Sequence, residues 1–369
     1  MERIVGMDDR HVWVARDKAS EWAAIHSSFF FGHLPFRPLI EAVCEPFIPD
    51  REGRTQTPAQ VIRRLADNLS RIVWAGPVWV DFGNLSVRDT LTFSDIARML
   101  DDLRASCGGW SHLIIPVVRT TSAPQVADAA FRWATTTGSG LCIRVMGLSD
   151  LAAQSLIVDT TVRQSGLSQQ QIDLIVDAQD LPSVMSQQQI ATQFPLSQTS
   201  RTWAIVAGTF PSTVTDLSPD KYLHRLPRTE WTEFSDDVSL PNGWRTPVFG
   251  DYATQGAIYV PSPGHAASPT IRYTAGEEYV VLRGRKGKEI DFNQYIGHSR
   301  FLRAEPLFRD VTSTNADTYV ERIAVGTNGT GNASTWRVAS LQRHVSVTEA
   351  QWAAHILMRP LVHSSGATP

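Results

Sequence analysis

The sequence predicts a (β/α)8, TIM-like barrel with an inserted β-hairpin and a C-terminal extension. Short apolar runs rich in Val and Ile alternate with helix-like stretches, a pattern typical of βα units that build a buried parallel sheet. Eight such runs occur before the pattern breaks after Gly250. Because a closed barrel of this type has eight strands, the count favours a barrel over an open doubly wound sheet.

The expected strands can be given in order. They are His11–Ala15, Pro38–Val43, Pro77–Phe82, Leu113–Val118, Leu141–Val145, Ile172–Asp177, Trp203–Phe210 and Thr246–Gly250. Helix start signals lie between them. Thr57 and Pro58 supply a cap and a proline at the first helical position, and Ser122 with Pro124 does much the same. The absence of GxGxxG and GxxxxGK[ST] motifs disfavours dinucleotide-binding and P-loop folds.

The chain after Gly250 predicts additions to one domain that spans residues 1–369. Residues 253–287 are expected to form an inserted loop and β-hairpin. A helix-like segment, Glu289–Arg303, could be the eighth helix of the barrel. Residues 328–369 predict a C-terminal strand and helix extension. Its expected elements are a strand over Thr335–Val347 and a helix over Thr348–Leu357, with Ser346 and Glu349 as a capping box.

Composition narrows the class of protein. The net charge of −3 gives no global attraction to nucleic acid or to an anionic membrane. The sequence has no signal-like N-terminus and no run of about 18 apolar residues, so we expect a cytoplasmic protein with no membrane partner. Cys44, Cys107 and Cys142 show no metal-binding spacing and are expected to be buried, reduced thiols.

Charged side chains gather at the ends of the expected strands. In a barrel these ends converge on one mouth, where active sites lie. The residues at these ends are Arg16, Lys18, Glu41, Asp81, Arg119, Arg144, Asp177, Asp180, Thr209, Asp251 and Tyr252. We expect Asp251 to reach the mouth from the last strand, with Gly250 allowing a sharp turn.

Two interpretations of this mouth remain open from the sequence. Glu41, Asp81 and Asp177 could hold a metal ion, which would leave arginines free to bind phosphate. Alternatively, the acids and arginines could form a self-neutralising network of structural ion pairs. Structural roles are also open for His344, Tyr273 and Trp336, as a hydrogen-bonded histidine and as core or cross-strand aromatics.

The chain resembles the beta protein family, which is named after a phage T4 member and is found in phages, prophages and many bacteria. The resemblance is carried by RPLIEAV, VWVDF, GLCIRV, IDLIVDAQD, WAIVAGTFP, LPRTEW, FGDYAT, TIRYT and TWRVASLQRH, in this order. The matching polar residues are Glu41, Asp81, Arg144, Asp177, Arg228, Asp251, Tyr252, Arg272, Tyr273, Trp336, Arg337 and His344. This chain departs from the family at Arg16, where a lysine is favoured, and at Arg343–His344, where paired histidines are common. The resemblance implies a role in phage–host conflict.

The first hypothesis is a defence-related protein whose charged mouth binds an anionic ligand, such as a nucleotide or a nucleic-acid end. As an enzyme it would hydrolyse nucleotides or phosphodiesters, with Mg²⁺ held by Glu41, Asp81 and Asp177 and proton transfer by Asp251 or His344. The ligand-binding residues would be Arg144, Arg228, Tyr252, Arg272, Tyr273 and Arg337. The second hypothesis is a non-catalytic sensor or adaptor that binds a protein partner, encoded alongside, through the hairpin Pro269–Arg285.

Overall fold

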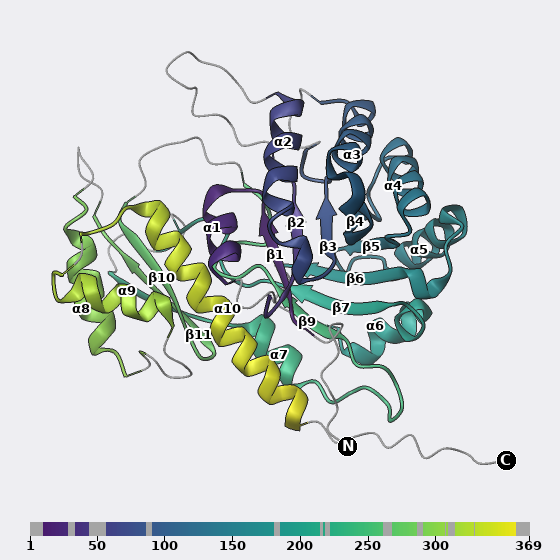
Figure 1. Ribbon diagram of the computed structural model, residues 1–369. Helices are drawn as coiled ribbons and strands as arrows, with labels where there is room; N and C mark the ends of the chain where they lie inside the picture. Colours follow the sequence, from purple (N-terminus) through teal and green to yellow (C-terminus); the bar gives the residue numbers. More distant parts are fainter. Residues whose placement is uncertain are drawn as a thin grey trace.

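The computed structural model contains the predicted closed barrel of eight parallel strands (Figure 1). It describes residues 10–28, 34–43, 57–85, 91–180, 185–214, 217, 222–260, 268–285, 291–306, 308, 314–327 and 329–358. The barrel strands, in order around the barrel, are β1 (Val12–Arg16), β2 (Arg37–Glu41), β3 (Val78–Asp81), β4 (Ile114–Arg119), β5 (Leu141–Met146), β6 (Ile172–Gln179), β7 (Thr202–Ala207) and β9 (Val248–Asp251). Each lies within an expected apolar run or within a few residues of one, so the predicted fold class is confirmed.

Helices cover the outside of the barrel. They are α1 (Ala19–Ser27), α2 (Pro58–Leu69), α3 (Phe93–Cys107), α4 (Pro124–Thr137), α5 (Leu151–Ser165), α6 (Gln187–Gln193) and α7 (Thr229–Asp236), with short 3-10 turns at Val73–Ala75, Gly108–Leu113, Gln169–Gln171 and Pro195–Gln198. Thr57 caps α2 in a reciprocal capping box with Gln60, as its sequence predicts. Pro124 opens α4, but Ser122 is not its cap: the N-cap is Ala123, and the Ser122 hydroxyl accepts from the backbone N–H of Arg119.

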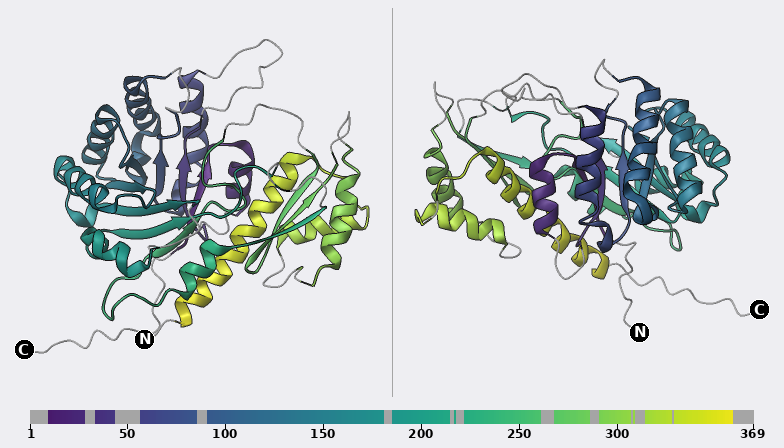
Figure 2. Two further views of the ribbon diagram at one scale, coloured as in Figure 1. Left: turned by 180° about the vertical axis from the view of Figure 1, so that it is seen from behind. Right: turned by 45° about the horizontal axis from the view of Figure 1, so that its top comes forward.

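The predicted hairpin belongs to a second, antiparallel sheet beside the barrel (Figure 2). Strands β10 (Thr270–Ala275) and β11 (Glu278–Arg283) form the hairpin, and β11 also pairs with β8 (Leu223–Pro227). Strand β8 lies in a segment for which the sequence predicted no strand. The helices α8 (Gln294–Ala304) and α9 (Asn315–Ala324) pack on one face of this sheet around a core that includes Tyr273, Leu302 and Val320.

The C-terminal segment is one long helix, α10 (Ala333–Met358), so the predicted strand over Thr335–Val347 is wrong. Ser346 and Glu349 lie inside this helix and cap nothing at its start. The buried positions recur at helical spacing, from Trp336 through Ser340 and His344 to Thr348. The aromatic and β-branched residues of this stretch resemble a strand, but their period is that of a helix.

α10 also fills the place predicted for Glu289–Arg303. The described part of that segment contributes to α8, which packs against α9 and β10 away from the barrel helices. α10 instead runs between the small sheet and the barrel, beside α1 (Figures 1 and 2). Its Leu341 and Val345 join the core beneath α1, and its Trp352 ring lies 5.9 Å from the ring of Phe234 in α7. The eighth helix is thus supplied by the C-terminus.

Gly250 serves close packing and not a turn. A Cβ at this position would lie 2.7 Å from Val206 Cγ2 and 2.9 Å from Val12 Cβ, because β9 closes the barrel between β7 and β1. The turn after β9 falls at Ala253, whose φ is 54°. The expected sharp turn at Gly250 is therefore wrong, although the glycine is needed for barrel closure.

Across the part of the chain that the structure describes, no helix combines the length and apolar character needed to cross a membrane.

Candidate functional site

Three carboxylates from different strands meet around one arginine inside the barrel mouth. Arg144, from β5, is fully buried and reaches between Glu41, Asp81 and Asp177. Its Nη1 lies 2.9 Å from Glu41 Oε1 and 2.5 Å from Asp81 Oδ2. Its Nε lies 2.8 Å from Asp177 Oδ2. The five donors of a guanidinium can serve several carboxylates at once, so strand-end convergence brings these four predicted residues together.

Arg119 adds a second guanidinium from the end of β4. Its Nε lies 2.9 and 2.8 Å from the two carboxylate oxygens of Asp81, and its Nη1 donates to Asn84 Oδ1 at 3.0 Å. Gly83 leaves the room for this side chain, since a Cβ there would lie 2.2 Å from Arg119 Nε. Burial would raise the pKa of Asp81, but Arg119 and Arg144 hold it below its usual value.

Tyr252 closes the mouth from the end of β9. Its Oη accepts a hydrogen bond from Arg144 Nη2 at 2.6 Å and donates to Asp177 Oδ2. Burial, reinforced by the charges of Asp177 and Glu41, raises the pKa of this phenol well above its usual value. Tyr252 therefore stays protonated and acts as a donor to the carboxylate. We call the following six residues the mouth network: Glu41, Asp81, Arg119, Arg144, Asp177 and Tyr252.

The mouth network is nearly balanced in charge. Three acids face two arginines, and Arg16 from the end of β1 adds a third cation with its Nε 3.5 Å from Glu41 Oε2. Within the described ranges, no group of three or more His, Cys, Asp and Glu side chains is arranged to hold a metal ion. The guanidinium of Arg144 lies where a shared ion would bridge Glu41, Asp81 and Asp177. Magnesium binding stays a prediction, and the geometry fits the ion-pair alternative.

Asp251 and His344 lie outside the mouth, between the barrel and α10. Asp251 and Tyr252 are neighbours in sequence, and alternation along a strand sends their side chains to opposite faces. Asp251 accordingly contacts α10, with its Oδ2 2.7 Å from His344 Nε2. The expectation that the Asp251 side chain faces the mouth is wrong.

The contacts of His344 resemble the hydroxyl–histidine–carboxylate arrangement of a nucleophilic triad. Thr274 Oγ1 lies 3.0 Å from its Nδ1, and Asp251 Oδ2 lies 2.7 Å from its Nε2. Thr274 and His344 are 0% exposed and Asp251 is 1% exposed, so no substrate can reach this hydroxyl. Burial would raise the pKa of Asp251, but His344 foremost and Arg228 next lower it to about 2. The contacts from Thr274 through His344 to Asp251 join the small sheet and α10 to the barrel. They fit the interpretation of His344 as a structural, hydrogen-bonded histidine.

Arg228 and Tyr273 also lie in this interface and not at the mouth. Arg228 is buried and donates to Thr348 Oγ1 at 2.9 Å and to Gln351 Oε1 at 2.6 Å. Tyr273 is buried in the small-sheet core and donates to Asp317 Oδ1 at 2.9 Å. Both side chains have protein partners that explain their burial, so neither is placed to bind a ligand at the mouth.

Cations gather beside the mouth, where β1, β10 and α10 approach each other. We call Arg16, Lys18, Arg272 and Arg337 the cationic cluster. Arg337 Nη2 donates to the buried carboxylate of Glu21 at 3.1 Å. Arg272 donates to the backbone carbonyl of Thr254 at 2.7 Å. Burial, with Arg337 and Arg16 adding repulsion that Glu21 offsets only in part, lowers the pKa of Arg272 to about 9.

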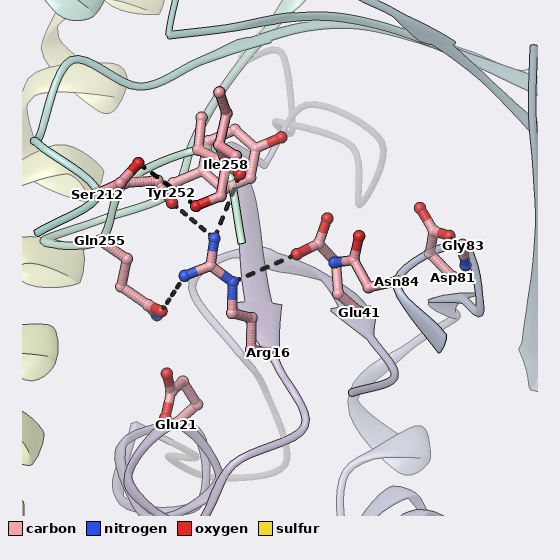
Figure 3. Close-up of polar contacts among 12 residues, drawn as sticks. Arg16, Glu21, Glu41, Asp81, Gly83, Asn84, Ser212, Tyr252, Gln255 and Ile258 are labelled. Atoms are coloured by element: carbon pink, nitrogen blue, oxygen red, sulfur yellow. Dashed lines mark hydrogen bonds and ion pairs between the residues drawn. The ribbon is translucent and has the colours of Figure 1, made fainter. Parts of the chain in front are cut away.

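Four residues at the mouth keep buried polar atoms without a hydrogen-bond partner in the described chain. We call them the mouth tetrad: Arg16, Glu41, Asn84 and Gln255 (Figure 3). The atoms are Arg16 Nε, Glu41 Oε2, Asn84 Nδ2 and Gln255 Nε2. Arg16 Nε and Glu41 Oε2 form an ion pair with each other at 3.5 Å. Since buried polar groups are almost always paired with protein, water or ligand, the Asn84 and Gln255 amide nitrogens are the two atoms of the tetrad that a bound group could still pair with.

Sequence reasoning placed Arg16 and Arg119 at strand ends but did not select them as site residues. It missed Glu21, Asn84 and Gln255 altogether. Asn84 and Gln255 each follow a barrel strand by three or four residues, and a search of the loops after the strands would have found them. Of the remaining strand-end residues, Asp180 is exposed and Thr209 donates to Glu230.

The cysteines play no part in the mouth. Cys107 and Cys142 are buried and free, as expected, and Cys44 lies outside the described residues. Burial raises the pKa of both thiols, that of Cys107 to about 12. Both therefore stay protonated and unreactive at neutral pH.

Comparisons with known proteins identify a family and show a distant likeness to a solved structure. The family model described as Beta protein matches residues 35–348. No curated protein matches the chain. Among solved structures, a 2,3-dimethylmalate lyase, described as a PEP mutase/isocitrate lyase superfamily member, is 12% identical with a TM-score of 0.33. That likeness covers 67% of this chain and 77% of the lyase, and at this TM-score it carries no argument about this chain.

Proposed function

The chain belongs to the beta protein family, and from the side chains beside its barrel mouth we propose that it binds a small anionic ligand there. The ligand would carry phosphate or carboxylate, and a nucleotide or a nucleic-acid end is the first candidate. Arg16, Arg272 and Arg337 would supply its charge-assisted hydrogen bonds.

The position of Arg272 carries this proposal. Its Nη1 donates to a carbonyl, its guanidinium lies 4.9 Å from the centroid of the Phe210 ring, and among the described residues no carboxylate forms an ion pair with it. An anion between Arg272 and Arg337 would offset the repulsion that lowers the pKa of Arg272. Glu21, already bonded to Arg337, is the acid that shares this cluster.

Binding fits this geometry better than metal-dependent phosphodiester hydrolysis. The three acids proposed to hold Mg²⁺ are bonded to Arg144 and Arg119. The two groups proposed to move protons, Asp251 and His344, are buried against α10. A hydrolase would need these groups around one reacting phosphate, and they lie in two separate clusters.

The alternative of an adaptor that uses the hairpin as its docking surface has less support. One face of the small sheet packs on α8, α9 and Trp336 of α10. From the other face, Tyr279 and Val281 pack with Phe210 of the loop after β7. Both faces of the hairpin are thus packed within the described chain, one against α8, α9 and α10 and the other against the loop after β7.

The biological setting is part of the same proposal. Members of the family occur in phages, prophages and bacteria, which supports a role in phage–host conflict inside the cell. Recognition of a ligand, without chemistry on it, would suit a sensor in such a conflict.

Thermal unfolding tests the proposal, because a ligand that binds only the folded state raises its stability. We expect inorganic phosphate or a nucleotide at 100-fold its Kd to stabilise the protein by about 2.7 kcal/mol. Arg272→Gln should abolish this effect, and it should raise the melting temperature of the unliganded protein because it removes a buried like charge.

The matched control is Arg132→Gln, which removes an exposed arginine paired with Asp101 on the barrel helices. It should leave the ligand effect intact. Absence of any stabilisation of the wild-type protein by phosphate or nucleotides, or full stabilisation of Arg272→Gln, would overturn anion binding at this position.

A further inference from the structure

A small cavity lies on the outer side of the barrel, between the ends of β6 and β7 and the helices α6 and α7. It leaves about 20 Å³ for the centre of a water-sized sphere, which is room for one small group, since a single water needs about 10–15 Å³ by this measure. Its apolar walls are Ala178, Ile205, Ala207, Phe234 and Phe249, and its polar walls are Gln187, Glu230, Glu233 and Asp237. Ala178 follows Asp177, which faces the mouth, and alternation along β6 turns Ala178 outward. The cavity is therefore separate from the mouth network.

The amide of Gln187 presents an acceptor to this cavity. Its Nε2 donates to the backbone carbonyl of Phe234 at 2.9 Å, while its Oε1 is buried with no hydrogen-bond partner in the described chain. Rotating the amide by half a turn would place Oε1 against that carbonyl, so the oxygen is the atom left over. Gln187 is 2% exposed. A buried acceptor of this kind normally has a donor beside it.

The carboxylate of Asp237 lacks a cation, unlike that of Glu230. Glu230 accepts from Tyr279 Oη at 2.6 Å and lies 3.5 Å from Arg228 Nε. Asp237 accepts only from the backbone N–H groups of Gln187 at 2.5 Å and Ser239 at 2.7 Å, and it forms no ion pair within the described chain. Its negative charge is thus offset by hydrogen bonds alone.

The surroundings of the cavity favour a positive charge. Among the described residues, no lysine, arginine or histidine lines it. It lies beside the last turn of α7, where the carbonyl end of a helix attracts cations. Glu233 and Asp237 are partly exposed, so the cavity borders solvent on this side. A cation that donates hydrogen bonds would meet acceptors and apolar walls, and no competing donor.

We propose that this cavity binds the ammonium group of a primary amine, which donates to Gln187 Oε1 and lies beside the carboxylate of Asp237. An ammonium group has three donors and no acceptor, which matches walls whose available polar atoms only accept. Its attached carbon would contact the apolar walls. Within the described ranges these acids are not arranged to hold a metal ion, so N–H donation and not metal coordination fits the site. The inference is independent of anion binding beside the mouth.

Thermal unfolding of the wild-type protein in four chloride salts at equal ionic strength tests the inference. The salts are those of methylammonium, sodium, potassium and tetramethylammonium. We expect methylammonium to raise the melting temperature above that in sodium chloride, because a ligand of the folded state stabilises it. Tetramethylammonium has the same charge but no N–H group, and it should have no such effect.

Three variants locate the site. Gln187→Leu should weaken methylammonium binding at least about tenfold, the change expected for loss of a hydrogen bond to a charged group. Asp237→Asn keeps the shape of the side chain and should also weaken binding, because it removes the unpaired charge. The matched control is Asp236→Asn, the same change at the preceding, exposed position, and it should leave binding unchanged.

Each contrary outcome overturns a defined part of the inference. Equal melting temperatures in methylammonium and sodium chloride would overturn amine binding and assign the cavity to bound water. Equal stabilisation by potassium or by tetramethylammonium would overturn recognition of N–H donors. Stabilisation that persists in Asp237→Asn and in folded Gln187→Leu would overturn the assignment to this cavity. Asp237 is partly exposed, so its variant is expected to fold and decides the location even where Gln187→Leu does not.

Discussion

The two ends of the barrel both hold buried arginines against carboxylates, but they satisfy them differently. At the base, Asp173 at the start of β6 accepts from Arg201 Nε at 2.9 Å, from Arg201 Nη2 at 2.8 Å and from Trp79 Nε1 at 2.7 Å. Arg37 lies with its Nη2 3.4 Å from the same carboxylate and its guanidinium over the Trp79 ring. One acid there has a full set of partners.

At the mouth, three acids share two guanidiniums and a phenol, and the amide nitrogens of Asn84 and Gln255 beside them are buried without hydrogen bonds in the described chain. In barrels of this type the base serves stability and the mouth serves function. The base also keeps buried nitrogens without hydrogen bonds, in the His11 ring, so it is the position of the mouth atoms in the loops after the strands that makes them candidates for ligand contacts.

Removal of Arg144 should have the largest effect. Arg144→Met leaves Glu41, Asp81 and Asp177 facing one another with one guanidinium fewer between them. Breaking a buried ion pair costs about 3–5 kcal/mol, and with three acids affected we expect the free energy of unfolding to fall by about 5 kcal/mol. Urea denaturation monitored by circular dichroism measures it. A loss below about 1 kcal/mol would show that the mouth network is hydrated and not a structural centre.

Removal of the base acid should cost somewhat less. Asp173→Asn keeps the shape of the side chain but leaves Arg37 and Arg201 without a counter-charge, and we expect a loss of about 3 kcal/mol. Asp101→Asn, which breaks an exposed pair with Arg132, is the control and should cost about 0–1 kcal/mol. Equal losses for the two variants would contradict the assignment of the base network to stability.

His11, just before β1 on the base side, should give the smallest of the three effects and one that depends on pH. Its ring is fully buried without a hydrogen-bond partner among the described residues. Burial lowers its pKa from 6.5 to about 4. Between these values the unfolded chain binds more protons than the folded one, so stability is full above about pH 6.5 and falls as the pH drops toward 4.

Acidification from pH 7 to pH 4 should therefore cost about 2–3 kcal/mol through His11. His11→Phe, which can still pack on Phe36, should flatten the unfolding free energy over this range. The exposed His112→Gln is the control and should keep the slope. An unchanged slope in His11→Phe would mean that other groups set the acid sensitivity of the protein.

Much of the mouth could be predicted from the sequence, for a geometric reason. Parallel strands in a barrel all end at one face, so Glu41, Asp81, Arg144 and Asp177 had to converge once the runs that carry them were recognised as strands. The same reasoning placed Tyr252 correctly. It failed for Asp251, because adjacent strand residues face opposite sides and the sequence alone does not set which one faces inward at a strand end.

The sequence by itself determined the eight barrel strands, since buried parallel strands need continuous apolar runs that few other structures require. Only the tertiary structure decided that α10 is a helix that closes the barrel. The spacing of Trp336, His344 and Thr348 would place them on one side of a strand or on one side of a helix, and packing against both the small sheet and the barrel selects the helix. The tertiary structure also decided the partners of Arg16 and Arg272. These side chains reach segments about 240 and 20 residues away, and no local pattern records contacts between segments that meet only when the barrel closes.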